Sequence, residues 1–311
     1  MNELMFTVVL PTYNRAGVVL DAVQSVLAQT YANFELIIVD DRSTDDTQAV
    51  LAEVQDPRVT VVANRRSKGP AGARNTGIFL ACGAWVCQID SDDLWPNDML
   101  ERLAVVIADA PVGVGIVYGS VAYLEIGTGR TTRIRRAGRA GNVHTVFLAN
   151  HFISHCSAAL RTSALKDVGG YDEAFRLKED SDLLLRMTER YEVLPVPDLV
   201  YMYRLGGRDQ LTGEKDEFLR SYKHYIYKHA RLLAEHPKAR YELLTNVLYL
   251  SVNAGDWSEA ARTWPKLMPS IWKAPRVFLR GHGKLVSLVV DKTKGEVLRL
   301  LRVLGLRKTR A

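Results

Sequence analysis

The stretch Gln88-Ile89-Asp90-Ser91-Asp92-Asp93 decides how this chain is read, because three carboxylates follow directly on the apolar run Ala84-Trp85-Val86-Cys87. A short apolar run of this kind, preceded by Gly83, is typical of a buried strand. Two like charges about 4 Å apart repel by about 4 kcal/mol at an effective dielectric constant of about 20, so the acidic turn needs compensation. Either a hard divalent cation or local capping of the next turn would supply it.

Apolar runs and helical patterns alternate along the first part of the chain. We expect strands at 6–10, 35–39, 59–62, 84–89 and 115–119. Helices are expected at 19–27, 70–81 and 96–109, and a further helix follows the second strand with Ser43 or Thr44 as its N-cap. Fully apolar strands that alternate with helices predict an α/β fold, in which a mostly parallel, Rossmann-like sheet is covered on both faces.

Polar residues follow three of these strands at the point where each one ends. Pro11-Thr12-Tyr13-Asn14 follows the first strand, Asp40-Asp41 ends the second, and the acidic turn follows the fourth. In such sheets ligands bind at the carboxyl ends of the strands, which predicts a site there. The helix start 68–75 offers free amides and Arg74 to a phosphate, although close packing of its small residues on the sheet is the alternative.

The pattern changes after Gly119. We expect a polar hairpin at 123–136, a short strand at 157–160, and a helix that opens with Glu179-Asp180-Ser181-Asp182. A metal held by Asp92, with Asp90 or Asp93, could neutralise charge on a leaving nucleotide. The pair Glu179-Asp180 is the best candidate for a base, because no Ser-His-Asp or Cys-His arrangement is apparent. Stabilisation of the positive end of the helix is the alternative for these acids.

These motifs, in this order, resemble those of the family 2 glycosyltransferases, which use nucleotide sugars and have the GT-A fold. The matching segments are 8–15, 37–47, 69–77, 89–93, 169–173 and 179–186. The resemblance implies an inverting hexosyltransferase that moves a sugar, by preference from a UDP-sugar, directly to a hydroxyl of a glycan or lipid-linked acceptor. It also implies surface polysaccharide biosynthesis as the setting.

The resemblance implies roles for single residues as well. Asp180 would be the general base, with Glu179 beside it, and Mg²⁺ or Mn²⁺ would be held by the DxD residues Asp90 and Asp92 together with Asp93. The residues expected to bind the nucleotide are Pro11, Thr12, Tyr13, Asn14, Asp40, Arg74, Asp90 and Ser91. His155 and Arg204 would border the acceptor or the phosphates. Many members carry a histidine after the last strand, and here Arg208 is expected to take that phosphate-facing role.

Charge and cysteine content limit the setting. Residues 1–215 carry 22 Lys and Arg against 27 Asp and Glu, whereas residues 216–311 carry 19 against 8. An odd number of cysteines without metal-like spacing is typical of a reducing compartment. We recognise no secretory signal, and no apolar run approaches the roughly 20 residues that span a bilayer. We therefore expect a cytoplasmic protein, or a peripheral one on the inner face of the cytoplasmic membrane.

Residues 1–215 are expected to form the catalytic domain and residues 216–311 a basic helical C-terminal region. The basic amphipathic pattern, with Trp257, Trp264 and Trp272, suits an anionic membrane surface, and a helical cap on the catalytic domain is the alternative. Segment 253–261 resembles the turn of a tetratricopeptide-like helix pair. Nucleic acid is not expected as a partner, because no recognition motif accompanies the charge.

Two other classes of function compete with glycosyl transfer. A catalytically silent scaffold could bind nucleotide sugar or membrane through the same fold, but Asp90, Asp92 and Asp180 are all present. A metal-dependent nucleotidyltransferase would need a triphosphate loop rich in glycine and basic residues near the start, and segment 11–17 does not have that composition.

Overall fold

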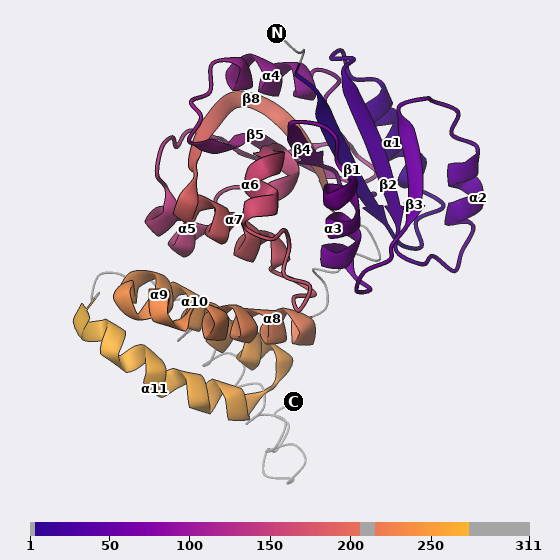
Figure 1. Cartoon of the computed structure of the whole chain (residues 1–311). Helices are drawn as coiled ribbons and strands as arrows, with labels where there is room; N and C mark the ends of the chain where they lie inside the picture. The colour runs from indigo at the N-terminus through magenta and orange to yellow at the C-terminus, as the bar shows by residue number, and fades with distance from the viewer. Residues whose placement is uncertain (1–3, 206–214, 274–311) are drawn as a thin grey trace, which may run out of the picture. The chain divides into compact units, whose positions relative to one another are not determined.

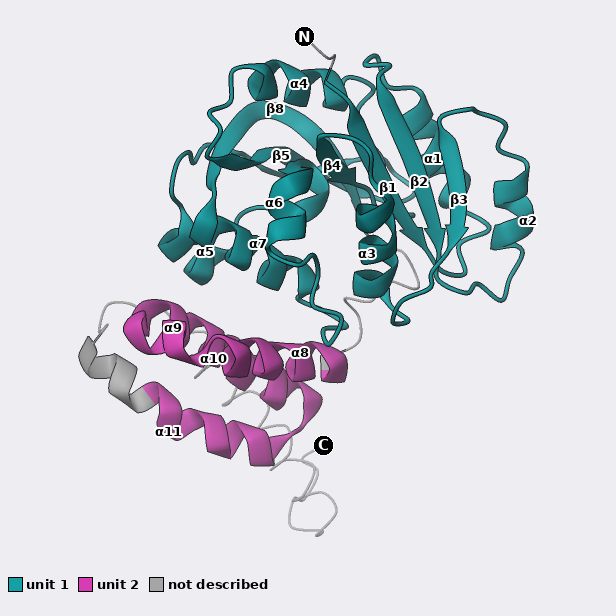
Figure 2. Ribbon diagram, viewed as in Figure 1, with its two compact units in different colours: residues 1–213 teal, residues 214–311 magenta. Residues whose placement is uncertain are grey.

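The computed structural model describes residues 4–205 and 215–273. The chain divides into two compact units, Met1–Gly213 (unit 1, teal) and Glu214–Ala311 (unit 2, magenta), as Figure 2 shows. Arg208 and residues 274–311 of the basic C-terminal region lie outside the described residues. The predictions for them therefore stay predictions.

A mixed β-sheet forms the centre of unit 1 (Figure 1). Its strands are β1 (Phe6–Thr12), β2 (Phe34–Asp40), β3 (Val59–Ala63), β4 (Trp85–Gln88), β5 (Val114–Glu125), β6 (Thr131–Arg135), β7 (Ala158–Arg161) and β8 (Glu192–Leu205). They are ordered β3-β2-β1-β4-β7-β5-β6, and β8 also pairs with β5. Only β6 and β7 run against the other strands. The predicted α/β class with a mostly parallel sheet is confirmed.

The antiparallel direction of β7 matters for function. Because β4 and β5 each pair antiparallel with β7, the start of β7 lies at the edge of the sheet where β4 ends. The segment before β7, the short 3-10 helix η1 (His155–Ser157), therefore reaches the same edge as the acidic turn after β4. A strand running the other way would carry these residues to the opposite edge.

Helices cover the sheet and follow the strands. In unit 1 they are α1 (Val19–Leu27), α2 (Thr47–Ala52), α3 (Pro70–Leu80), α4 (Met99–Ala108), α5 (His144–Asn150), α6 (Thr162–Asp167) and α7 (Glu179–Arg190). The apolar stripes of α1 and α4 bury Val23 and Leu103 in one core with β-strand residues such as Leu36 and Trp85. Each such side chain contributes about 1.5–3 kcal/mol through its removal from water.

Two details of the sequence prediction are wrong. Neither Ser43 nor Thr44 caps α2, which begins at Thr47, whose N–H and hydroxyl are bound by Asp45. The fifth strand does not end at Gly119 but continues to Glu125, because β8 pairs with β5 along its whole length. The predicted polar hairpin is therefore the end of β5 joined to β6.

Unit 2 is helical throughout its described residues, as predicted for them. It comprises α8 (Lys215–Lys228), α9 (Ala230–Glu235), α10 (Pro237–Ala254) and α11 (Trp257–Lys273). Helices α10 and α11 pack together around Tyr241, Leu248 and Leu267. Gly255, at φ 76°, ends α10, and Asp256 accepts the N–H of Glu259 at the start of α11. None of the described helices combines the length and apolar character that crossing a membrane requires.

Gly83 permits a close approach of the backbone before β4 to the backbone of β1. A Cβ at this position would lie 2.5 Å from the backbone nitrogen of Thr7 in β1, and its own N–H is bound to the Thr7 hydroxyl. We predict that Gly83→Ala lowers the free energy of unfolding by about 1–3 kcal/mol, because backbone rather than a side chain must move. The comparison is Gly113→Ala, where no atom lies within 4 Å of the added methyl group. Equal thermal midpoints for the two variants would contradict this account.

Candidate active site

Arg74, in the second turn of α3, joins two acidic segments that lie far apart in the sequence. One guanidinium nitrogen lies 2.7 Å from Asp90 Oδ1, and another lies 2.6 Å from Glu179 Oε1. The Arg74 and Glu179 side chains are only 6% and 9% exposed, so leaving either one unpaired would be costly. The end of β4 and the start of α7 therefore meet at this buried cation.

The network sets the charges of its carboxylates. Burial favours the neutral acid at Asp90, but Arg74 outweighs it and lowers the pKa of that carboxyl. At Glu179 burial outweighs the attraction of Arg74, so the pKa is raised. Asp90 and Glu179 share one guanidinium, and Asp90, the more exposed of the two, stays ionised more readily than Glu179.

Asp180 is the carboxylate at the start of α7 that stays accessible. Its side chain is 35% exposed, its Oδ2 lies 3.6 Å from His155 Nδ1, and its Oδ1 accepts the Ser181 N–H at 2.6 Å. Burial opposes its ionisation, but His155 and then Lys178 lower its pKa below the ordinary value. Asp180 is therefore ionised at neutral pH and can accept a proton.

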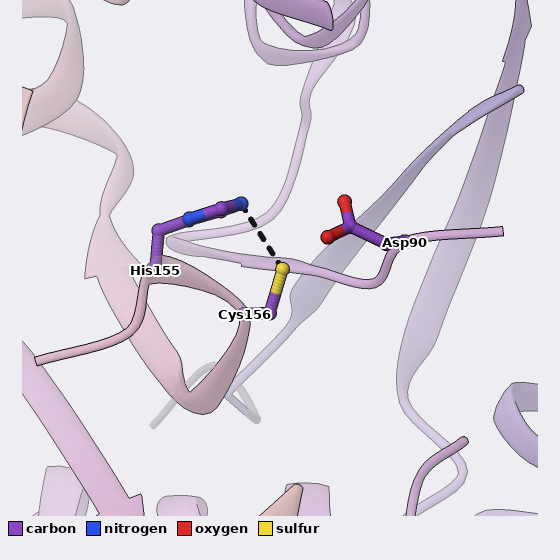
Figure 3. A group of neighbouring side chains, drawn as sticks. All are labelled: Asp90, His155 and Cys156. Atoms are coloured by element: carbon purple, nitrogen blue, oxygen red, sulfur yellow. Dashed lines mark hydrogen bonds between the residues drawn. The ribbon is translucent and has the colours of Figure 1, made fainter. Parts of the chain in front are cut away.

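His155 lies between Asp180 and the thiol of Cys156. Figure 3 shows its contact with Cys156, beside Asp90. Its Nε2 lies 3.0 Å from Cys156 Sγ, while Nδ1 is the atom that approaches Asp180. Nδ1 must carry a proton to face a carboxylate favourably. This requires either the Nδ1–H tautomer, with the thiol donating to Nε2, or the imidazolium ion. In both states the histidine stabilises the charged form of Asp180.

The acidic turn does not assemble the three-carboxylate cluster that the sequence suggested. Asp93 is 1% exposed, and its oxygens accept the Tyr201 hydroxyl at 2.6 Å and the Arg204 N–H at 2.7 Å. Burial, with Asp90 next, raises the pKa of Asp93 to about 8. Asp93 therefore ties the turn to β8 with both carboxylate oxygens, and its place in the predicted metal set stays a prediction.

Asp92 fits a metal ligand better. It is half-buried and accepts no hydrogen bond from another described side chain or backbone group, while burial and the charge of Asp90 raise its pKa. A divalent cation would relieve that unfavourable charge, and carboxylate oxygens are what Mg²⁺ and Mn²⁺ prefer. Within the described chain, the three groups whose ligand atoms converge are instead Asp90, His155 and Cys156. Their sulfur and nitrogen atoms suit those hard ions poorly.

The loops after β1 and β2 are bound to each other. Asn14, at φ 50°, accepts the Thr44 N–H at 2.7 Å, and its own N–H donates to Ser43 Oγ at 3.0 Å. Asp40 accepts the Ser43 N–H and the Gln48 side-chain amide. The side chains of Asn14 and Asp40, predicted to bind nucleotide, are thus engaged within the protein and shape this edge.

The other predicted residues lie along the same edge. Tyr13 is 40% exposed, with the Lys68 ammonium 4.3 Å from its ring centre. Thr12 Oγ1 is buried and has no hydrogen-bond partner among the described residues. Ser91 is buried in the acidic turn, and Pro11 pairs with Val39 in the sheet. Arg204 donates to the Asp92 carbonyl and to Asp21, so it holds the acidic turn in place.

Sequence reasoning missed two residues that shape the site. Lys178 precedes α7 in the left-handed conformation at φ 69°, a strained geometry for a non-glycine residue, and its ammonium lies 3.5 Å from His151 Nδ1. Glu173 accepts hydrogen bonds from Asn75, Arg66 and the Ser67 N–H, which fastens the 169–173 turn to α3. The Gly-Gly-Tyr-Asp-Glu motif marked this turn without showing what it binds.

Comparison with known proteins identifies the family. The family model described as Glycosyl transferase family 2 matches residues 7–169, more than half of the chain. The chain belongs to the family 2 glycosyltransferases. The succinoglycan biosynthesis protein ExoO of Rhizobium meliloti is 31% identical over 240 residues, which are 70% of this glycosyltransferase and 68% of ExoO.

A second relative matches a shorter segment. It is the Escherichia coli enzyme named UDP-Glc:alpha-D-GlcNAc-diphosphoundecaprenol beta-1,3-glucosyltransferase WfgD. It is 40% identical over 101 residues, which are 32% of this chain and 40% of WfgD.

Solved structures show the same GT-A fold. Staphylococcus aureus TarS 1-349 in complex with UDP-GlcNAc aligns with a TM-score of 0.62 at 19% identity, over 88% of this chain and 83% of TarS 1-349. The mannosyltransferase PcManGT of Pyrobaculum calidifontis, with GDP-Man and Mn²⁺, aligns with a TM-score of 0.56 at 21% identity. That alignment covers 93% of this chain and 87% of PcManGT. The predicted fold class is confirmed.

Glu173 gives this glycosyltransferase a pH-dependent clamp. Burial opposes its ionisation, but the bonds from Asn75, Arg66 and Ser67 lower its pKa to about 2. The stabilisation is therefore complete above the ordinary pKa of a glutamate and is lost as the pH falls from there toward 2. We predict that Glu173→Gln costs about 1–3 kcal/mol of unfolding free energy at pH 7, and that the difference shrinks below pH 4.

The matched control is Glu53→Gln, because Glu53 is exposed at the end of α2. Urea titrations of both variants and the parent at several pH values between 3 and 7 provide the measurement. A Glu173→Gln deficit that is the same at every pH would show that the charge of this clamp is not what stabilises the turn.

Proposed function

We propose that this family 2 glycosyltransferase transfers a sugar, with inversion, from a nucleoside diphosphate donor to a hydroxyl of a glycan or lipid-linked acceptor in surface polysaccharide biosynthesis. The observation that carries the proposal is the contact of Asp180 with His155 beside the Arg74 network. Asp180 is thereby an accessible, ionised carboxylate beside the acidic turn that follows β4. A direct displacement needs one such base.

The arrangement of the two acids supports a single displacement. In the proposed reaction Asp180 takes the proton of the acceptor hydroxyl while the acceptor oxygen attacks the anomeric carbon and the nucleoside diphosphate leaves. A double displacement needs a second carboxylate as nucleophile. Glu179 is a poor one, because its side chain is buried and bound to Arg74. Inversion of the anomeric configuration follows.

The donor is proposed to lie along the loops after β1 and β2. The buried Thr12 hydroxyl lacks a partner among the described residues, and the next residue, the exposed Tyr13, has the Lys68 ammonium over its ring. These groups suit a base and a ribose, with Asp40 close by at the end of β2. A UDP-sugar is the proposed donor, since the name of the relative WfgD specifies UDP-Glc.

Asp92 and Asp90 are the proposed ligands of Mg²⁺ or Mn²⁺, which when bound would neutralise the charge of the leaving diphosphate. Arg204 holds the backbone of Asp92, and Asp93 anchors the turn through Tyr201. These contacts fix the backbone of Asp92, while its carboxylate remains available to the proposed metal ion. His155 keeps Asp180 charged on the acceptor side.

A lipid-linked glycan is proposed as the acceptor. ExoO is named for succinoglycan biosynthesis, and the name of WfgD specifies a sugar on diphosphoundecaprenol as its acceptor. Both names point to hydroxyl acceptors in glycan assembly. The membrane contact that such an acceptor requires fits the predicted peripheral location at the inner face of the cytoplasmic membrane.

Replacement of the proposed base tests the chemistry. We predict that Asp180→Asn lowers kcat by a factor of about 10²–10⁴, because an amide cannot take the acceptor proton. Donor affinity, measured by calorimetry with UDP-sugars and Mn²⁺, should change by less than about threefold. Asp109→Asn, an exposed aspartate after α4, is the control. An Asp180→Asn enzyme with parental turnover would exclude Asp180 as the base.

A pair of substitutions in the acidic turn tests the metal ligands. We predict that Asp92→Asn raises the Mn²⁺ concentration for half-maximal activity at least about tenfold, because it removes a charged oxygen ligand. Asp93→Asn should leave that concentration within about twofold, since an amide can still accept the Arg204 N–H and donate to Tyr201. The reverse pattern would assign the metal to Asp93.

A further inference from the structure

The end of β5, the turn 126–130 and β6 form a strongly basic projection that the proposed reaction does not use. We call residues 125–139 the arginine hairpin. It contains Arg130, Arg133, Arg135, Arg136 and Arg139, whereas Glu125 is its single acidic residue. Glu125 and Arg130 form an exposed ion pair at 3.4 Å, which contributes little. The surrounding residues 1–215 carry more acidic than basic side chains, so this charge is segregated.

The arginine hairpin is exposed and carries apolar side chains among its charges. Ile126 and Ile134 are 48% and 50% exposed, and a Gly-Thr-Gly turn with two positive φ angles closes the hairpin. Two guanidinium groups lie over aromatic rings: the Arg133 Cζ is 5.5 Å from the ring centre of Tyr123, and the Arg139 Cζ is 5.4 Å from that of Phe152. Such stacking pre-orders an arginine while its N–H groups still point outward to an anion.

The hairpin begins beside the proposed active site. Strand β5 runs parallel to β8, and Leu124, near the end of β5, pairs with Arg204 of β8. Arg204 in turn donates hydrogen bonds to Asp92 and Asp93 of the acidic turn. One strand therefore separates the base of the hairpin from the acidic turn. A surface that binds the hairpin would lie at the acceptor side of the same edge.

We propose that the arginine hairpin docks this enzyme on an anionic phospholipid bilayer, so that a lipid-linked acceptor reaches Asp180 from the membrane surface. This inference rests on the proposed lipid-linked acceptor. Each arginine near an anionic bilayer adds about 1 kcal/mol, a factor of about five in partitioning. Two exposed isoleucines suit the acyl boundary beneath the phosphates, and a soluble phosphate-bearing chain would leave them without a partner.

Protection of an edge strand is the alternative explanation for these arginines, because charge on β6 discourages pairing with another chain. That role explains basic residues on β6 itself. It does not explain Arg136 and Arg139, which follow the strand, or the exposed Ile126 at the turn. The membrane proposal accounts for all of them with one partner.

A fluorescent probe on the turn tests the docking in the full chain. Thr128→Cys, in a Cys82→Ser background that removes the exposed native thiol, places an environment-sensitive dye at the tip. We expect a blue shift with vesicles of phosphatidylcholine and phosphatidylglycerol, none with phosphatidylcholine alone, and reversal at 1 M salt. The control is Val112→Cys, 91% exposed just before β5, on the opposite edge. Equal responses at both positions would overturn the proposal.

Charge removal tests the contribution of the arginines with the same probe. The double variant Arg133→Ala/Arg136→Ala should weaken the vesicle response by about 25-fold in lipid concentration. The control variant Arg65→Ala/Lys166→Ala removes two exposed positive charges elsewhere in unit 1 and should weaken it less than about threefold. Because the dye reports the hairpin alone, binding through the C-terminal region does not mask the result.

Two further measurements distinguish a bilayer from a soluble phosphate compound as the partner, and failure of the docking proposal from failure of the proposed acceptor. A shift with soluble inorganic pyrophosphate or polyphosphate equal to that with vesicles would overturn the bilayer as the partner. Transfer to a short-chain, water-soluble acceptor should be unchanged in the Arg133→Ala/Arg136→Ala variant, because these residues do not touch the reacting atoms. If such transfer fails in the parent enzyme while the vesicle response persists, the acceptor assignment is wrong and the docking surface stands.

Discussion

The shared guanidinium of Arg74 is the interaction on which the site depends. It binds Asp90 after β4 and Glu179 at the start of α7, two segments that meet only because the chain folds. Arg74 and Glu179 are buried, and buried charges are unstable unless each is paired. Any arrangement that separated the acidic turn from α7 would leave a buried charge without its partner. The packing of α7 against the acidic turn and the pairing of charges at the site therefore depend on each other.

Further contacts hold the pieces that Arg74 brings together. Asn75, its neighbour, exchanges two hydrogen bonds with the backbone of Tyr171, and the Tyr171 hydroxyl donates to Gln88 of β4. Glu173 adds its own bonds to α3 and the loop before it. Hydrogen bonds from α3 thus hold the turn that leads to α7. The accessible groups, Asp92 and Asp180, sit on a framework that these hydrogen bonds and the Arg74 ion pairs hold together.

The sequence was sufficient for the fold class and for the acidic segments of the site. Apolar runs and helical periodicity are local signals, and Asp90–Asp93 and Glu179–Asp180 are contiguous in the chain. The orientation of single side chains was not predictable in this way. Asp93 turns inward because Tyr201 and Arg204 of β8 meet it, and Asn14 is engaged because the loop after β2 reaches it. Such partners depend on long-range pairing, which no local pattern encodes.

The reversed strand β7 has a consequence for how this fold can diversify. His155 and Cys156 lie just before β7, which enters the sheet from the edge where β4 ends. The loops after β1 and β2, the proposed donor loops, instead follow strands that end at that edge. Phe147 and Leu148 of α5 anchor the chain between the arginine hairpin and His155 in the core, so only its exposed turn 126–130 is free to lengthen or shorten. Strand register and the donor loops would be untouched. Under the proposed function, a change in this surface segment would alter the acceptor side while the proposed donor loops keep their residues.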